Sequence, residues 1–229
     1  MKLSIIIPIY NEKNTLLKLL EEVKNADLGN VKKEIILVDD FSTDGTRDIL
    51  KKLSKQYIIL FHQKNCGKGR AIRTGLVKAT GDIVIIQDAD LEYDPNDYKK
   101  LIEPIITGQA KVVYGSRRLN KNNKQYSHLS FLLGGLLVNF ITNLIYGLNI
   151  TDEATCYKVF KIDVINSINL RCERFEFCPE ITAKVAKKKI KIVEVPISYS
   201  PRSGKEGKKI KWYDGVEAIW TLIKYRFKD

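Results

Sequence analysis

The feature that most constrains the fold of this chain is a regular alternation of short apolar runs with longer segments of helical spacing. Each run is followed by a turn and a predicted helix, in units of about 25–30 residues. This alternation predicts an α/β fold in which helices flank a mostly parallel sheet through right-handed crossovers. The strands predicted in this way cover residues 3–9, 33–38, 57–61, 83–86 and 112–114.

The second half of the chain is less regular. A polar loop over residues 120–125 precedes a long apolar segment over residues 129–148, and a further strand is predicted over residues 190–195. A basic segment, residues 200–211, then leads into a last amphipathic helix that begins at Trp212. The 229 residues are enough for one large domain with an apolar core.

Acidic residues follow the fourth predicted strand. Asp88, Asp90 and Glu92 alternate with Ala89 and Leu91. Open α/β sheets bind ligands at the carboxyl ends of their strands, and carboxylates at alternating positions of an extended segment can converge on one point. Because Mg²⁺ and Mn²⁺ prefer such oxygen ligands, the motif predicts a site for a metal ion and a diphosphate. Taken alone, the motif fits a solvated acidic turn equally well.

Three further features are candidates for ligand binding. Asp39, at the end of the second strand, can accept a hydrogen bond from a base or a ribose hydroxyl, or can cap the following turn. The glycine-lysine-glycine sequence at 67–69 can bring backbone N–H groups to an anion, or can simply begin a helix. Arg117 and Arg202 can each bind a phosphate through a planar pair of donors, or can lie on the surface.

Positive charge dominates the carboxyl-terminal part of the chain. The formal net charge is +12, and thirteen Lys or Arg stand against five Asp or Glu from Lys184 to Asp229. Such a basic end suits a nucleic acid, an anionic membrane or a phosphorylated substrate, although a lysine-rich solvated surface is an equal alternative. A nucleic-acid-binding module would place aromatic residues between the basic ones. Few occur there, so we expect no nucleic acid as a partner.

Cysteine usage and the apolar segments bear on the location of the protein. The four cysteines lack CxxC spacing and no signal peptide is recognised, which predicts reduced thiols in the cytosol. His62 and His128 have no partner at metal-binding spacing and are expected to be structural. Polar residues and glycines dilute the segment 129–148, so we expect a core or membrane-surface helix there rather than a spanning one. The last helix should pack on the domain or lie on a membrane or a partner.

The motifs, taken together and in this order, resemble a known family. PIYNE, VDDFSTDGT, GKGRAIRTG, QDADLEYDP and GSR are similar to the motifs of family 2 glycosyltransferases with the GT-A fold. TCYKVF, RFEFCPE, EVPISY and PRSGKEGKKI resemble the branch of dolichol-phosphate mannose and dolichol-phosphate glucose synthases. The resemblance covers nearly the whole chain. It implies a single GT-A domain over residues 1–229, with a nucleotide-sugar-binding half over 1–118 and an acceptor-binding half over 119–229.

The resemblance also implies roles for individual residues. Donor binding is expected at Pro8, Tyr10, Glu12, Asp39, Lys68, Asp88, Ala89, Lys208 and Lys209. Mg²⁺ or Mn²⁺ is expected at Asp88, Asp90 and Glu92, and the residues expected to act in catalysis are Asp90, Arg117 and Arg202. One departure is evident, because synthases of this type often carry another arginine shortly after GSR, where this chain has residues 126–128.

The reaction implied is inverting transfer of a hexose from a nucleoside diphosphate sugar, GDP-mannose or UDP-glucose, to a polyprenyl phosphate. The enzyme would bind peripherally to the cytoplasmic face of a membrane, alone or with a separate membrane-spanning partner. An acceptor phosphate is largely a dianion at neutral pH and needs no strong base. The alternative, a soluble or cell-wall glycan hydroxyl, would need one. Asp152, Glu153, Glu176 and Glu180 are the candidates for that base. A catalytically inactive sugar-nucleotide-binding protein is a further alternative.

Overall fold

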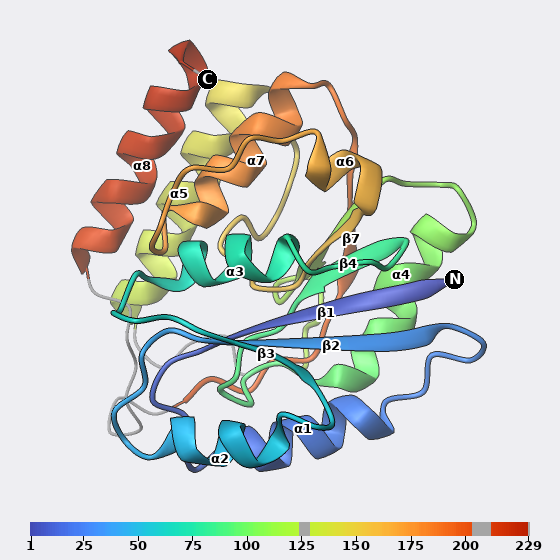
Figure 1. Cartoon of the computed structure of the whole chain (residues 1–229). Helices are drawn as coiled ribbons and strands as arrows, with labels where there is room; N and C mark the ends of the chain where they lie inside the picture. The colour runs from blue at the N-terminus through green and yellow to red at the C-terminus, as the bar shows by residue number, and fades with distance from the viewer. Residues whose placement is uncertain (124–128, 203–211, 229) are drawn as a thin grey trace.

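The computed structural model describes residues 1–123, 129–202 and 212–228. They form a seven-stranded sheet in the order β3-β2-β1-β4-β6-β5-β7, flanked by helices (Figure 1). The strands are β1 (Lys2–Ile9), β2 (Lys32–Asp39), β3 (Ile58–Phe61), β4 (Ile83–Ile86), β5 (Val112–Ser116), β6 (Lys158–Lys161) and β7 (Ile192–Pro196). The predicted α/β class is therefore confirmed, and the strands expected in the first half lie within about two residues of their observed bounds.

Four parallel strands, β3, β2, β1 and β4, form one side of the sheet. Their register aligns Ile9 with Asp39, and Asp39 with Phe61, so these three strands end at the same level. The inner strands are apolar on both faces because helices cover both, as parallel sheets require. The loops after β1, β2 and β4 consequently open at one edge of the sheet.

Strand β6 was not predicted from the sequence. It runs antiparallel between β4 and β5, which interrupts the expected series of parallel strands. Strand β6 is difficult to recognise in the sequence because it contains Lys158, and a lysine seldom lies at a fully buried position. Here its ammonium donates to the carbonyl oxygens of Glu153 and Thr155 and lies 4.1 Å from the ring centroid of Tyr114. Those acceptors compensate for the lost hydration.

The helices are α1 (Leu16–Asn25), α2 (Thr46–Leu53), α3 (Lys68–Leu76), α4 (Tyr98–Ile106), α5 (Leu129–Tyr146), α6 (Ile162–Asn166), α7 (Phe177–Lys187) and α8 (Trp212–Phe227), with a 3₁₀ turn, η1 (Pro95–Asp97), before α4. Figure 1 shows α1 and α2 on one side of β1–β3 and α3 on the other. Gly75 lets α3 approach β1 closely, because a Cβ there would lie 2.6 Å from a methyl carbon of Ile6.

Helices α5, α7 and α8 pack against one another beyond the sheet. Polar groups fix this arrangement: the Tyr146 hydroxyl of α5 donates to the carbonyl oxygen of Leu222 in α8 at 2.7 Å. Asn139 and Asn143 of α5, whose polarity dilutes the apolar segment, bind the backbone of Ile150 and Glu153 on the protein side. No helix within the described residues combines the length and apolarity that crossing a bilayer demands.

Candidate active site

The loop after β1 is held in place by the loop after β2. The backbone N–H groups of Asn11 and Glu12 donate to the hydroxyls of Ser42 and Thr46, each at 2.9 Å. In return, the Asn11 side chain accepts a hydrogen bond from the backbone N–H of Thr43 at 2.8 Å. Asn11 has a φ of 52°, a left-handed conformation that asparagine tolerates better than most residues. The motifs PIYNE and VDDFSTDGT thus form one structural unit at the end of the sheet.

Asp39, the predicted base-binding residue, lies beneath this unit. It is fully buried, and one of its oxygens accepts the backbone N–H of Ser42 at 3.2 Å. Its other oxygen, Oδ2, lies 3.3 Å from the Arg47 Nε and has no hydrogen-bond partner among the described residues. An acceptor of this kind is costly unless something donates to it. A base could reach Asp39 only if neighbouring side chains moved.

The neighbouring Asp40 explains the start of α3. Its carboxylate accepts the backbone N–H groups of Cys66 and Gly67 at 2.8 and 2.7 Å, and lies 2.7 Å from the His62 Nδ1. The N–H of Arg70 donates to the carbonyl oxygen of Glu173. The sequence at 67–69 does begin a helix, and Asp40 takes the N–H of Gly67, while the anion site expected there stays a prediction.

The two glycines of that sequence serve close packing. A Cβ on Gly67 would lie 2.4 Å from the carbonyl oxygen of Glu173, and one on Gly69 would lie 2.8 Å from that of Cys172. Gly67 also has a φ of 93°, which disfavours other residues. The start of α3 consequently packs directly against the backbone of the loop that precedes α7.

Asp40, His62 and Cys66 place three potential ligand atoms within 4.8 Å of one another. The His62 ring is already engaged at both nitrogens, by Asp40 and by the Thr74 hydroxyl at 3.0 Å. This cluster therefore holds the loops after β2 and β3 together, in agreement with the structural role expected for His62.

A lysine at the start of α3 forms an ion pair with the acidic loop after β4. The Lys68 ammonium lies 2.6 Å from one oxygen of Asp88. Burial opposes the charge on Lys68, but the Asp88 carboxylate outweighs it and raises the pKa of Lys68 above its usual value. Asp90 accepts the backbone N–H of Glu92 at 3.1 Å, across Leu91, whose φ is 62°. The loop is thus bent rather than extended, and the bend gathers its carboxylates.

The crowding of these acids has an electrostatic consequence. Burial, followed by the charges of Asp88 and Glu92, raises the pKa of Asp90 to about 7. A divalent cation would relieve this repulsion, and carboxylate oxygens are the donors that Mg²⁺ and Mn²⁺ prefer. The residues present therefore fit the metal that the motif predicts.

Arg202 connects the acidic loop with the loop after β1. Its Nη2 lies 2.8 Å from Glu12 Oε2, its Nε donates to the carbonyl oxygen of Asp90 at 2.7 Å, and its backbone N–H donates to Glu92 at 2.9 Å. Four residues predicted for the site from distant parts of the chain thus meet at one place. Lys208 and Lys209 lie outside the described residues, as does most of the basic segment 200–211.

Arg117 lies at the end of β5, and its planar fork is already engaged. Its Nε and Nη2 donate to the two carboxylate oxygens of Asp152 at 2.7 and 2.6 Å. Burial alone would raise the pKa of Asp152, but the Arg117 guanidinium holds it below its usual value. The guanidinium carbon also lies 5.0 Å from the ring centroid of Tyr199. A phosphate at Arg117 would therefore meet a guanidinium that Asp152 holds in a fixed orientation.

A second guanidinium lies next to Arg117. The Arg118 Nη2 is 3.2 Å from the position that a Cβ on Gly135 of α5 would occupy. Arg118 therefore reaches the long helix, near which the resemblance leads us to expect a further arginine. Residues 126–128, which follow in that region of the sequence, lie outside the described residues.

The four carboxylates considered as general bases are all engaged in protein contacts. Asp152 pairs with Arg117, and Glu153 is buried and accepts the Thr182 hydroxyl at 3.1 Å. Glu180 binds Lys184 at 2.6 Å and two backbone N–H groups. Both oxygens of Glu176 accept backbone N–H groups at the start of α7.

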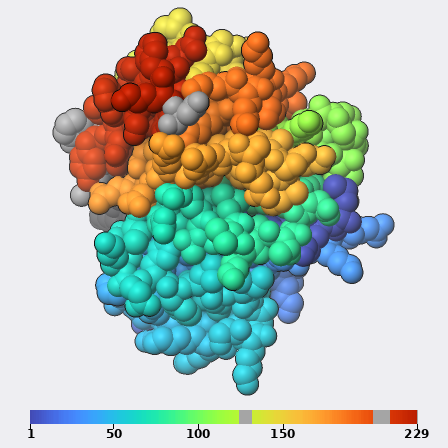
Figure 2. Space-filling view, turned by 45° about the horizontal axis from the view of Figure 1, so that its top comes forward, coloured from blue at the N-terminus to red at the C-terminus, as the bar shows by residue number. Residues whose placement is uncertain are grey.

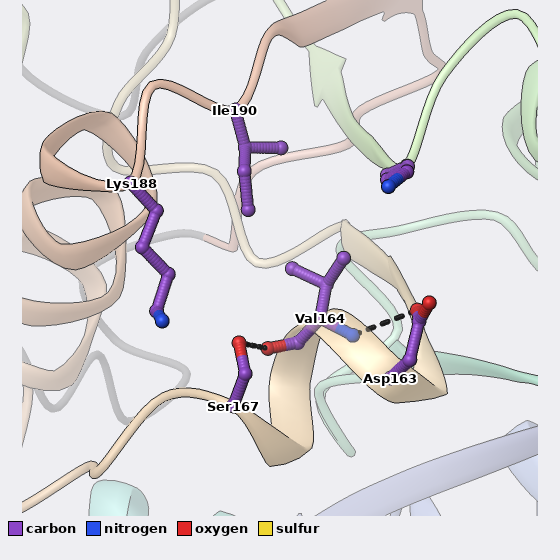
Figure 3. Close-up of a pocket in the computed structure, with 6 residues that line it drawn as sticks. Asp163, Val164, Ser167, Lys188 and Ile190 are labelled. Carbon is purple, nitrogen blue, oxygen red and sulfur yellow. Dashed lines mark hydrogen bonds between the residues drawn. The ribbon is translucent and has the colours of Figure 1, made fainter.

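A hollow among the described residues lies elsewhere. It is an open depression of about 380 Å³ beside the start of β5 and helix α6, at the end of the sheet opposite the acidic loop (Figure 3). Its side chains make local contacts: Asp163 accepts the N–H of Val164, and Ser167 donates to the carbonyl oxygen of Val164. The lining residues are Lys111, Asp163, Val164, Ser167, Lys188 and Ile190. This depression is not part of the candidate site.

The sequence pairs Asp40 with Asp39 at the end of the second strand, but the role of Asp40 in holding the start of α3 was not predicted. Three other residues at the site were not singled out from the sequence. Tyr199 occurs in EVPISY without any local sign of function. Arg47 and Arg118 carry no local signal either, because only the fold brings them to Asp39 and to α5.

A mostly parallel sheet with acids beyond β4 fits the class of glycosyltransferase that the motifs resemble, and comparison with known proteins supports this class. The model of glycosyl transferase family 2 matches residues 4–168. The chain belongs to this family, as its motifs predicted.

Its relatives include several lipid-phosphate transferases. One is the UDP-N-acetylglucosamine–dolichyl-phosphate N-acetylglucosaminyltransferase of Methanococcus voltae, 35% identical over 84% of this chain and 83% of that protein. Another is the dolichol-phosphate mannosyltransferase of Pyrococcus furiosus, 32% identical over 98% of this chain and 64% of that protein. The resemblance to the dolichol-phosphate branch is thereby confirmed.

A solved structure confirms the GT-A-like fold. Glucosyl-3-phosphoglycerate synthase from Mycobacterium tuberculosis, solved with Mn²⁺, UDP-glucose and phosphoglyceric acid, superposes with a TM-score of 0.73. The match covers 98% of this chain and 79% of that one, at 17% sequence identity. At that identity, the likeness concerns the fold alone.

Proposed function

We propose that this chain transfers a sugar from a nucleoside diphosphate sugar to a polyprenyl phosphate, with inversion at the anomeric carbon. Membership in glycosyl transferase family 2 supports the reaction class. The relatives named for dolichyl phosphate support the acceptor class. GDP-mannose and UDP-glucose, the donors expected from the sequence, are joined by UDP-N-acetylglucosamine because of the M. voltae relative.

The choice of acceptor rests on one observation: all four candidate bases already bind other groups of the protein. A sugar hydroxyl has to lose a proton as it attacks, so it requires a carboxylate ready to accept that proton. Asp152, Glu153, Glu176 and Glu180 instead bind an arginine, a lysine, a hydroxyl or backbone N–H groups. A phosphate acceptor attacks as an oxyanion and does not depend on such a base. The geometry therefore favours a phosphate acceptor.

In this proposal the half of the chain before residue 119 binds the donor. Pro8 at the end of β1 and the loop with Tyr10 and Glu12 would surround the nucleoside, and Asp39 would accept a hydrogen bond from the base after neighbouring side chains move. Asp88 and Asp90 hold Mg²⁺ or Mn²⁺ with help from Glu92, and Ala89 lies between them. The metal, when bound, neutralises charge on the leaving diphosphate.

The half after residue 118 binds the acceptor and supports the transfer, with help from basic residues of the first half. Arg202 would turn from Glu12 toward the diphosphate, since a guanidinium binds phosphate oxygens through two hydrogen bonds. Lys68, paired with Asp88, and the basic residues Lys208 and Lys209 would add positive charge there. Arg117, fixed by Asp152, and its neighbour Arg118 would hold the acceptor phosphate.

The outer faces of α5 and α8 fit a peripheral membrane contact at the cytoplasmic face. Figure 1 shows the amino-terminal ends of both helices on the side toward which β1 runs, and Figure 2 shows α8 on the surface beside α7. Basic residues near the end of α8 would attract anionic lipids. The apolar side chains exposed on these faces are Leu133, Leu136, Leu137, Phe140 and Leu144 of α5, and Tyr213, Val216, Trp220, Ile223 and Phe227 of α8.

The test is a panel of radiolabelled donors, UDP-N-acetylglucosamine, UDP-glucose and GDP-mannose, each incubated with the chain, Mn²⁺ and a polyprenyl phosphate. We expect label from one donor to enter the organic phase as a polyprenyl-linked phosphosugar. Mild acid should then release the labelled sugar from the lipid. The product should be β-linked when the donor is α-linked, which NMR can establish. Label that enters only a water-soluble glycoside, with a glycan added as acceptor, would overturn the choice of acceptor.

A further inference from the structure

Tyr199, which follows β7, lies between two parts of the candidate site. Its hydroxyl donates to Glu92 Oε2 at 2.8 Å, on the acidic loop. The face of its ring meets Arg117, whose guanidinium carbon lies 5.0 Å from the ring centroid. No direct contact between Glu92 and Arg117 occurs among the described residues, so Tyr199 is the side chain that both share.

The backbone around Tyr199 is fixed independently of these two contacts. Its N–H donates to the Asn123 side chain at 3.0 Å, and it forms an isolated antiparallel bridge with Tyr93. The N–H of Ser200 donates to the carbonyl oxygen of Glu92 at 2.9 Å. The Tyr93 ring packs edge-on against the Tyr199 ring, with 5.3 Å between centroids. The ring is therefore held in place before any ligand binds.

Two different parts of one side chain thus serve two different neighbours. The hydroxyl is a hydrogen-bond donor to a carboxylate, a charge-assisted bond of the stronger kind. The ring face attracts a guanidinium, an interaction that does not involve the hydroxyl. Substitutions at this position can consequently remove one contact or both.

We propose that Tyr199 is a positioning residue that aligns the metal-binding acids with the arginine of the acceptor phosphate. Its hydroxyl fixes the Glu92 carboxylate at the donor side. Its ring fixes the plane of the Arg117 guanidinium together with Asp152. The inference rests on the proposed function for the identity of the two ligands, the metal and the acceptor phosphate. Tyr199 would set the distance between their binding sites.

The experiment compares Tyr199→Phe, which keeps the ring, with Tyr199→Leu, which removes both contacts. Calorimetry measures Mn²⁺ binding in the presence of UDP or GDP, whichever binds the wild type. A second titration adds a short-chain prenyl phosphate to the complex of protein, Mn²⁺ and nucleoside diphosphate, in which no turnover occurs. Tyr57→Phe and Tyr57→Leu, at the start of β3 and away from the site, are the matched controls.

We expect Tyr199→Phe to weaken Mn²⁺ binding about threefold to tenfold and to change prenyl phosphate binding less than twofold. Tyr199→Leu should weaken Mn²⁺ binding to the same extent and prenyl phosphate binding about threefold to tenfold. The Tyr57 variants should change neither constant. Melting temperatures of all variants identify any effect of misfolding, and the conservative Tyr199→Phe keeps the test valid if Tyr199→Leu unfolds.

The proposal is overturned if a folded Tyr199→Phe binds Mn²⁺ like the wild type, or if it weakens both ligands in equal proportion. Failure of the proposed function gives a different result, in which the wild type forms no phosphosugar in the donor panel and binds no prenyl phosphate. The Mn²⁺ titration of Tyr199→Phe still decides the role of the hydroxyl in that case. If the wild type shows no prenyl phosphate binding in the second titration, this result counts against the role proposed for the Tyr199 ring.

Discussion

At the scale of single residues, the site contains more acid than its own cations neutralise. Lys68 compensates Asp88 and Arg202 compensates Glu12, while Asp90 is left next to two other carboxylates. Such crowding of carboxylates is unfavourable without a ligand, and a bound divalent cation would relieve it. Ligand binding at this position therefore has an electrostatic driving force built into the folded chain.

Substitution of Asp90 tests this view. Asp90→Ala should lower transfer below about a tenth of the wild-type rate, because a carboxylate that holds the metal is lost, a matter of several kcal/mol. The free energy of unfolding measured without metal should not fall, since burial and the neighbouring acids already oppose the charge on Asp90. Transfer above that level with Mn²⁺ present would contradict the assignment. Asp27→Ala, an exposed acid on the far side of α1, is the control.

Arg202 offers a second test. Arg202→Lys keeps the charge but loses the planar fork that contacts Glu12 and the Asp90 carbonyl together. We expect kcat to fall about tenfold to a hundredfold, as steady-state transfer assays would show. Arg226→Lys, on the exposed face of α8, should be kinetically silent when the acceptor is presented in detergent. A wild-type kcat for Arg202→Lys would mean that the diphosphate is held by other residues.

At the scale of elements, α5 and α8 show how one helix can serve two environments. The inner face of α5 carries Asn139 and Thr142, which are buried, whereas its outer face exposes leucines and Phe140. Helix α8 is anchored by Tyr225, which lies under the Lys184 ammonium, and it exposes Trp220 on the other side. Exposed apolar side chains gathered over two adjacent helices are typical of a contact surface.

Vesicle co-sedimentation tests whether that surface meets lipid. The double change Phe140→Glu and Trp220→Glu should reduce binding to anionic vesicles at least tenfold, because it places charge where apolar rings would enter the bilayer interface. High salt should weaken wild-type binding, since the basic residues near the end of α8 act through screened charges. The control is Val77→Glu, which makes the same change at an exposed apolar residue just after α3, outside the two helices. Binding that survives the double change would show that this surface is not what meets the lipid.

The elements also show which features a sequence can reveal. The strands β1 to β4 were predicted because each is a continuous apolar run, and the acids after β4 because they adjoin such a run. Strand β6 was missed because the partners that make a buried Lys158 tolerable are not visible in a linear pattern. The anion site at 67–69 stays a prediction, and the N–H of Gly67 within it is already taken by Asp40, a residue 27 positions away. Local patterns thus gave the strands and the acids, whereas long-range pairing determined which groups remain available.

At the scale of the whole molecule, stability depends on contacts at the end of the sheet opposite the acids. Glu34 at the start of β2 accepts hydrogen bonds from Ser4 of β1, from Thr80 before β4 and from Lys2. Burial alone would raise the pKa of Glu34, but these donors lower it from 4.5 to about 2. One carboxylate therefore ties three parallel strands together at their amino-terminal ends.

A pH series of unfolding experiments measures this contribution. Because the pKa of Glu34 is lower in the folded chain, its stabilisation is fully present above pH 4.5 and is lost as the pH falls through about 2. Glu34→Gln should lower the free energy of unfolding by about 1–3 kcal/mol at pH 7, and this difference should shrink between pH 4.5 and 2. Glu103→Gln, exposed on α4, should show no such trend. A difference that is constant with pH would assign the effect to packing rather than to charge.

The contact between Arg202 and Glu12 joins positions 190 residues apart in the chain. The part that matches the family model ends at residue 168, so it contains every acid of the candidate site but neither Tyr199 nor Arg202. During synthesis the first four strands of the sheet can form early, while the candidate site gains Arg202 only after that residue has left the ribosome. A nascent chain can thus fold most of its sheet well before the site is complete, and premature termination after the family-matched part would leave Glu12 without its arginine partner.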